Sequence, residues 1–318
     1  MEFAAVTDIR CLADGLAFPE SPVVYPDGSV VVSEMAAGRI TRVRSDGATE
    51  TVADVGGGPN GVGLLPDGRL VVCQNGGSTF GIGFWPYDFE GCAQLFRPVG
   101  AAAHPVTPQL QVVDVDGSVH TLATEFRSRG GRMMPLVRPS DICVDADGGF
   151  YVTDGGTTHD RQRIMTGLLY GRPDGQLEEI VYPLEMPNGV AMSPDGDRVY
   201  VAETRTRRVW VFGLSASGRI AGGRGLATVP SGGPLNIGGA DGLCVAADGT
   251  VLVATLGAGG VTAFTSSGDM LGALPLDDPM TTNLALSVDE RTLYLTLASS
   301  GRLVAIDGWR SALTTPRS

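Results

Sequence analysis

The stretch NGVAMSPDGDRVYVAE, residues 188–203, decides the fold. It contains a short apolar run, a Pro-Asp-Gly turn and a second run rich in valine, a pattern typical of two β-strands joined by a tight turn. Related stretches recur along the chain: ESPVVYPDGSVVVSE from Glu20, NGVGLLPDGRLVVCQ from Asn60, SDICVDADGGFYVTD from Ser140, DGLCVAADGTVLVAT from Asp241 and NLALSVDERTLYLTL from Asn283. One strand–turn–strand unit therefore occurs six times.

A second, weaker hairpin lies between successive copies, with turns near Asp46, Asp116, Asp174, Gly218 and Gly268. Two hairpins make a four-stranded antiparallel blade, and blades recur roughly every 40–50 residues in β-propellers. One strand follows the last copy (301–309) and a spare strand precedes the first (6–12), so together they complete the sixth blade and remove free edges. We predict an all-β, six-bladed propeller in a single domain over residues 1–318, with a short disordered tail from about residue 311 to 318.

The composition excludes several classes of protein. Of the 318 residues, 43% are hydrophobic, enough for a large core. The formal net charge of −12 argues against nucleic acid as a partner. No apolar run is long enough to cross a membrane, and the first ten residues lack the features of a secretory leader. The five cysteines are scattered without a C-x-x-C pair. These features predict a cytoplasmic protein that acts on a small molecule.

One position of the repeat is polar in every copy. The residues six positions before the turn triplet are Glu20, Asn60, Ser140, Asn188, Asp241 and Asn283. The first strand of each propeller blade lines the central channel, so equivalent positions converge at one mouth. This predicts a ring of six oxygen-bearing side chains, two of them acidic.

Two interpretations of this ring compete. Asn-Gly and Asp-Gly pairs are common in turns, which explains Asn60, Asn188 and Asp241 individually. That interpretation does not explain Glu20, which lies between prolines, or the shared phase of the acids and amides. Clustered carboxylates are stabilised by a bound cation, and oxygen ligands without histidine or cysteine favour a hard ion. The pattern predicts one divalent ion, Ca²⁺ first, with Mn²⁺, Mg²⁺ or Zn²⁺ as alternatives.

At these residues the chain resembles the senescence-marker-protein/gluconolactonase family of six-bladed propellers, called regucalcin in animals. More distantly it is similar to diisopropyl fluorophosphatase and the paraoxonases. The motifs that carry the resemblance are FPESPVV (18–24), RPSDICVDADGGFYVTD (138–154), MPNGVAMSPDGDRVYVAET (186–204) and GADGLCVAADG (239–249). The segment 59–77, which includes Asn60, is most similar to the bacterial gluconolactonase branch.

The resemblance implies a function and a set of site residues. Glu20, Asn188, Asp241 and position 140 would hold the ion, although the family usually has Asn where this chain has Ser140. Either Ser140 or the adjacent Asp141 would then contribute. Family members hydrolyse lactones, which implies a small lactone or ester as substrate. Asp241 would be a ligand and also either the general base or a nucleophile.

Further substrate contacts are predicted around the ring. Arg138 matches a substrate-contacting arginine found in part of the family, and Asn60 and Asp141 belong to the ring or adjoin it. Three long loops are expected at the same mouth: 76–108 with Trp85, 126–139 with several arginines and methionines, and 155–166 with His159. The aromatic residues of the first loop would contact the substrate, pack on a blade edge or form a subunit contact.

Two other functions fit the same pattern. A metal-dependent propeller is readily recruited to another reaction, such as phosphoester hydrolysis or a biosynthetic cyclisation or isomerisation, and the Ser140 departure is compatible with this. A propeller also serves as a non-catalytic binding platform, because fold alone does not determine function. The acidic ring favours an enzyme, since a platform needs no charged channel axis.

Overall fold

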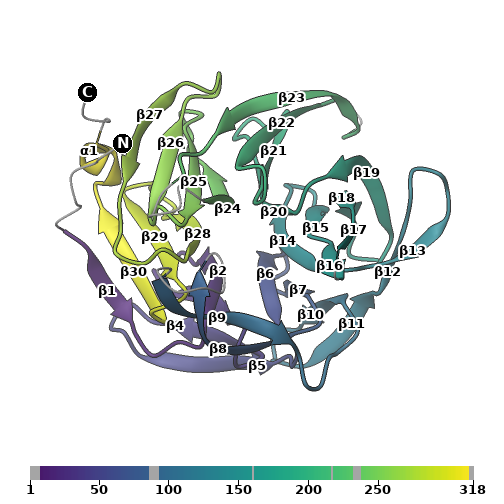
Figure 1. Cartoon of the computed structure of the whole chain (residues 1–318), viewed down its shortest axis with the longest axis horizontal. Coiled ribbons are helices and arrows are strands. Elements are labelled where there is room, and N and C mark those ends of the chain that lie inside the picture. The colour runs from purple at the N-terminus through teal and green to yellow at the C-terminus, as the bar shows by residue number, and fades with distance from the viewer. Residues whose placement is uncertain (1–7, 86–92, 160, 216–217, 232–237, 315–318) are drawn as a thin grey trace.

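The computed structural model describes residues 8–85, 93–159, 161–215, 218–231 and 238–314. Figure 1 shows six small antiparallel sheets arranged in a ring around a central axis, which confirms the six-bladed propeller. Five blades have four strands, and blade 3 is widened to six. No helix in the described part of the chain is long and apolar enough to cross a membrane.

Each blade begins with its innermost strand and proceeds outward. Blade 1 contains β2 (Pro19–Val24), β3 (Val30–Glu34), β4 (Arg39–Val43) and β5 (Thr49–Asp54). Blade 2 contains β6 (Pro59–Leu64), β7 (Leu70–Gln74), β10 (Gln109–Val113) and β11 (Val119–Ala123). Blade 3 contains β14 (Pro139–Val144), β15 (Phe150–Asp154), β18 (Thr166–Gly171) and β19 (Leu177–Leu184). Blade 4 contains β20 (Pro187–Met192), β21 (Arg198–Glu203), β22 (Arg208–Leu214) and β23 (Ile220–Thr228). Blade 5 contains β24 (Gly239–Val245), β25 (Val251–Leu256), β26 (Val261–Phe264) and β27 (Met270–Leu274). Blade 6 contains β28 (Thr281–Leu286), β29 (Thr292–Leu297), β30 (Arg302–Asp307) and β1 (Arg10–Ala13).

The two ends of the chain meet in blade 6, as predicted. β1 pairs antiparallel with β30 and becomes the outermost strand of the blade, so that β30 is not left as an open edge. The predicted disordered tail begins too early: a short helix α1 (Trp309–Ala312) follows β30, and Thr314 pairs with Ala273 of blade 5. The apolar Trp309 drives this order by packing into the core. Residues 315–318 lie outside the described part.

Three segments predicted as loops are hairpins. β8 (Ser78–Trp85) pairs with β9 (Ala93–Ala101), and β16 (Thr157–His159) pairs with β17 (Gln162–Ile164). β12 (Glu125–Arg127) and β13 (Met133–Pro135) add to β19, the outer strand of blade 3. The prediction that 126–139 covers the channel mouth is therefore wrong for most of that segment. Its strands extend the rim of the blade, and its exposed side chains include Arg127, Arg129, Arg132, Met133 and Met134.

The core lies between neighbouring blades and is built mainly of valine, leucine and alanine from the inner strands. These residue types favour strands and pack well on pleated surfaces. One cluster joins blades 5 and 6 and includes Trp309, which is 1% exposed and donates from its ring Nε1 to the Glu290 carbonyl at 2.9 Å. The end of the chain is thus part of the core.

Replacing Trp309 by alanine is expected to lower the free energy of unfolding by about 3–5 kcal/mol, because a fully buried indole leaves a cavity. Chemical denaturation followed by fluorescence or circular dichroism measures the loss. The matched control is Arg310→Ala: its guanidinium lies 4.3 Å from the Trp309 ring centroid but is 43% exposed, so a loss below about 1 kcal/mol is expected. Equal losses for the two variants would contradict the packing role of Trp309.

Candidate functional site

The polar ring lies where each innermost strand has an irregularity. The register between the first and second strands shifts just after the start of β2, β6, β14, β20, β24 and β28. Bulges of this kind redirect a side chain and are common beside functional sites. In β2 the shift falls between Glu20 and Val23, and in β20 it falls between Pro187 and Val190. Six equivalent side chains are thereby presented at the channel mouth.

In blade 6 the ring member is Thr282, not Asn283. The sequence alignment placed the turn triplet of this copy at residues 289–291. Glu290, however, has a φ of 56°, the left-handed conformation that Gly196 adopts with a φ of 70° in blade 4. The triplet is therefore residues 288–290, and the position six residues before it is Thr282. Asn283 lies one step further along the strand and is buried.

The glycines that follow Asn188 and Asp241 serve close packing and not a turn. A Cβ atom on Gly189 would lie 2.3 Å from the Asp241 carbonyl oxygen, and one on Gly242 would lie 2.3 Å from the Asn283 side chain. Neither glycine has a positive φ. The innermost strands of neighbouring blades approach so closely here that only glycine fits. The turn interpretation of these Asn-Gly and Asp-Gly pairs is therefore wrong.

The ring residues line a cavity of about 250 Å³ at the mouth. It brings together side chains from all six blades and from the β8–β9 hairpin. The ring contributes Glu20, Asn60, Ser140, Asn188, Asp241 and Thr282. An apolar wall is formed by Phe18, Met35, Met186, Leu256 and Met280, and the remaining lining residues are Arg97, Pro98, Arg138, Gly155 and Thr204.

The acids of the ring are buried together. Glu20 is 6% exposed and Asp241 is 4% exposed. Burial, reinforced by the charges of Asp241 and Asp141, raises the pKa of Glu20 well above its usual value. Burial and the Asp141 charge raise the pKa of Asp241 in the same way, and a hydrogen bond from Asn188 Nδ2 opposes the rise. Two carboxylates are thus held in a small volume where negative charge is unfavourable.

This donor set fits a hard divalent cation. In the described part of the chain no arginine forms an ion pair with Glu20 or Asp241, so their charges lack a protein counterion. No three His, Cys, Asp or Glu side chains among the described residues are arranged to hold a metal. The available donors are two carboxylates, the Asn188 amide and the Ser140 hydroxyl, all oxygen ligands suited to Ca²⁺.

Neutral side chains fix the orientation of these donors. The Asn188 amide nitrogen also donates to the Thr204 hydroxyl at 3.3 Å. The Thr282 hydroxyl lies 3.0 Å from that of Thr296 and donates to the Pro19 carbonyl at 3.3 Å, and its interaction with Glu20 opposes the rise in the pKa of that carboxyl. A half-turn of the Asn188 amide would exchange its oxygen and its nitrogen, which occupy equivalent positions, and would bring the oxygen to face the cavity. Neither Thr204 nor Thr282 is predicted from the sequence pattern, and Thr282 takes its place in the repeat only when the last turn is set at residues 288–290.

The remaining predicted residues differ in position. Asn60 and Arg138 line the cavity, and burial lowers the pKa of the Arg138 guanidinium. Asp141 does not belong to the lining: its carboxylate accepts hydrogen bonds from the Ile142 and Val190 backbone N–H groups at 2.9 and 3.3 Å. Burial raises its pKa to about 6. Asp141 therefore joins β14 to β20 one residue deeper in the channel.

Trp85 and His159 end strands β8 and β16, and their side chains lie outside the described part. Other aromatic residues of the first hairpin are well placed. Phe80 and Phe96 pack against Phe18, with ring centroids 5.1 and 6.5 Å from its ring. The hairpin thus extends from blade 2 across the mouth to a cluster that includes Leu256 and Met280 of blades 5 and 6. It encloses one side of the cavity with apolar surface.

Known proteins are similar to this chain in sequence and in fold. A family model described as SMP-30/Gluconolactonase/LRE-like region matches residues 18–299. Relatives include adipocyte plasma membrane-associated protein of Rattus norvegicus, 29% identical over 66% of this chain and 54% of its own length. Lactonase drp35 of Staphylococcus saprophyticus is 27% identical over 78% of this chain and 66% of its own length.

Solved structures extend the likeness to the whole fold. A gluconolactonase from Xanthomonas campestris superposes with a TM-score of 0.72 at 23% identity, covering 96% of this chain and 95% of the other. The matches to curated relatives are shorter, and the first of them span about half to two thirds of the relative's length. Because the family model covers nearly all six blades, the chain belongs to the SMP-30/gluconolactonase/LRE-like family of β-propellers.

Proposed function

We propose that this protein is a divalent-metal-dependent hydrolase that opens a lactone at the channel mouth. The observation that carries the proposal is the pair of buried carboxylates, Glu20 and Asp241, which share one cavity with Asn188 and lack a protein counterion among the described residues. Lactonase and gluconolactonase are among the names of its relatives. Their family membership supports the same class of reaction.

Glu20, Asn188, Asp241 and Ser140 would hold the ion, Ca²⁺ in the first instance. A bound cation polarises the lactone carbonyl and stabilises the negative charge that develops on its oxygen. The Asp241 carboxylate would accept a proton from an attacking water, and attack by the same carboxylate on the carbonyl is the other route.

The rest of the cavity indicates the kind of substrate. At about 250 Å³ it admits a small ring compound. Met35, Met186 and Met280 give it an apolar, adaptable wall. The Arg138 guanidinium has no hydrogen-bond acceptor among the described residues and is mostly buried, which suits it to bind a carbonyl or carboxylate oxygen of the substrate. We therefore propose a compact lactone with one apolar face and one polar face.

Ser140 would limit the affinity of the site for the ion. Ser140 Oγ donates to the Arg138 carbonyl at 3.2 Å, and its short side chain places the hydroxyl close to the backbone. Ser140→Asn is expected to lower the Kd for Ca²⁺ about tenfold, because a longer amide oxygen reaches further into the cavity. Isothermal titration of EDTA-treated protein measures this change. Ser140→Ala is the control and should not tighten binding; an unchanged or weaker affinity in Ser140→Asn would remove position 140 from the ligand set.

A substrate panel tests the proposed function. Acid release is followed from sugar, aliphatic and aromatic lactones with the protein as purified, after EDTA, and after Ca²⁺, Mn²⁺ or Zn²⁺ is restored. Hydrolysis that is lost with EDTA and regained with metal supports the proposal. Metal binding without turnover of any lactone would indicate a recruited reaction, and absence of both would indicate a binding platform.

A further inference from the structure

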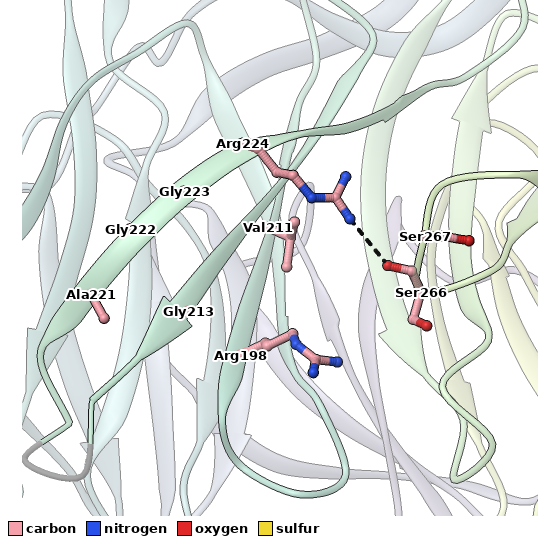
Figure 2. A pocket seen from close by; sticks show the side chains of 9 residues that line it. All are labelled: Arg198, Val211, Gly213, Ala221, Gly222, Gly223, Arg224, Ser266 and Ser267. Carbon is pink, nitrogen blue, oxygen red and sulfur yellow. Dashed lines mark hydrogen bonds between the residues drawn. The ribbon is translucent and has the colours of Figure 1, made fainter.

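A second cavity lies away from the channel mouth, in the groove between blades 4 and 5 (Figure 2). Its volume is about 640 Å³. β21 starts at Arg198 and reaches the mouth end only at Glu203, which pairs with Pro187 beside Asn188. Arg198 and the groove therefore lie at the opposite end of blade 4 from the polar ring. The proposed lactone chemistry does not use them.

Part of the floor of this groove carries no side chains. Gly213 of β22 pairs directly with Gly222 of β23, and a Cβ atom on either glycine would meet nothing within 4 Å. Paired residues of antiparallel strands point to the same face. Arg198 of β21 pairs with Gly213, so its side chain rises from the same face at one side of the bare floor.

Arg224 bounds the other side of the floor. It pairs with Val211 and lies on the same face as Arg198, two strands away, or about 10 Å between backbones. Its guanidinium donates to two carbonyl oxygens, those of Gly225 at 3.2 Å and Ser266 at 3.4 Å. No carboxylate among the described residues forms an ion pair with it. Its positive charge is therefore not neutralised within the described protein.

The charge of Arg198 is also largely available. It forms an ion pair with Asp197 at 3.4 Å, with the two side chains 43% and 51% exposed, and the Tyr200 side chain is its second partner. Exposed pairs of this kind are weak. Figure 2 shows both guanidinium groups directed toward the turn of blade 5 that contains Ser266 and Ser267. The Ser267 hydroxyl donates to Asp269, whereas the Ser266 hydroxyl has no hydrogen-bond partner among the described residues.

We propose that this groove binds the phosphate group of a small organic phosphate between Arg198 and Arg224. A phosphate carries up to two charges and accepts hydrogen bonds from two guanidinium groups at once, whereas a single carboxylate is satisfied by one. The Gly213–Gly222 floor allows close approach, and the Ser266 hydroxyl supplies a further donor. The volume exceeds that of a phosphate ion and leaves room for an organic part. With a net charge of −12, the chain attracts an anion only through such a local arrangement.

Titration calorimetry with inorganic phosphate and glycerol phosphate tests this site, with glycerol as the uncharged comparison. Arg198→Gln and Arg224→Gln are each expected to weaken phosphate binding about tenfold or more, through loss of a charge-assisted hydrogen bond. Gly222→Leu keeps both arginines but fills the floor, and it should weaken binding as well. The matched control is Arg291→Gln, which removes one charge from a side chain that is 86% exposed on blade 6.

Each outcome decides the proposal. Tight binding by the wild type and Arg291→Gln, with weak binding by the three groove variants, supports it. Binding that falls equally in all the arginine variants and survives in Gly222→Leu would reflect net charge alone and overturn the proposal, as would no binding by the wild type at millimolar phosphate. Unaltered circular dichroism and thermal midpoints exclude misfolding. Tighter binding of glycerol phosphate than of inorganic phosphate would show that the organic part also contributes.

Discussion

Asp241→Asn is expected to lower kcat for lactone opening by roughly 10²- to 10⁴-fold, the contribution of a well-placed general base. Asparagine keeps the size of the side chain and an oxygen that Asn188 Nδ2 can reach, but it cannot accept a proton. Its effect should fall mainly on kcat if Asp241 moves a proton, because the cavity keeps its shape. Steady-state kinetics at saturating Ca²⁺ separates this effect from weaker metal binding.

The matched control for this variant is Asp248→Asn. Asp248 lies in the turn between β24 and β25 of the same blade, and its Oδ1 accepts a hydrogen bond from the Thr250 backbone, which asparagine preserves. It lies outside the cavity, so kcat should not change. If Asp241→Asn retained the activity of Asp248→Asn at saturating metal, the catalytic role assigned to Asp241 would be wrong.

Glu20→Gln is expected to weaken Ca²⁺ binding but to stabilise the fold of the metal-free protein. Loss of a carboxylate ligand should raise the Kd for Ca²⁺ at least about 100-fold, since even supporting residues around metal sites contribute 10- to 100-fold. Without metal, the ionised Glu20 is unfavourable because burial and the Asp241 charge raise its pKa. A group with a raised folded pKa contributes stability at low pH and loses it as pH rises through that value. At neutral pH the metal-free variant should therefore unfold at a higher temperature than the wild type.

Thermal unfolding with EDTA and with excess Ca²⁺ measures both effects in one experiment. In the wild type a bound ion raises the midpoint by favouring the folded state. In Glu20→Gln the starting midpoint should be higher and the increase with Ca²⁺ much smaller. A variant that is destabilised in EDTA and still shows the full Ca²⁺ increase would place the ion elsewhere.

The repeat made the fold predictable from the sequence. Six copies of one strand–turn–strand unit predicted a closed propeller, and the spare strand predicted at residues 6–12 is β1, residues 10–13, which pairs with β30. The position of the ring was also predictable, because Glu20 and Asp241 share a phase that local turn preference does not impose. The blade 6 member of the polar ring was wrongly predicted to be Asn283. The turn of that blade could not be located from its sequence, because Glu290 adopts a left-handed φ that is usually found at glycine.

The surroundings of the site could not be predicted in the same way. Residues 76–108 lack a repeat partner, so nothing in their pattern reveals that Phe80 and Phe96 reach across the mouth to Phe18. The segment around Met133 lies instead on the outer rim, because β12 pairs with β19. Insertions are positioned by long-range packing, and their local sequence does not specify it.

The most direct test of the account is a metal titration of EDTA-treated protein in which bound Ca²⁺ and the rate of lactone opening are measured in the same samples. We predict that the rate rises in proportion to bound ion and reaches its maximum at one ion per chain. Glu20→Gln should bind little Ca²⁺ in the same range and remain inactive. Full lactone opening in protein shown to be free of metal, or a rate that does not follow the bound ion, would contradict a metal-dependent site at the channel mouth.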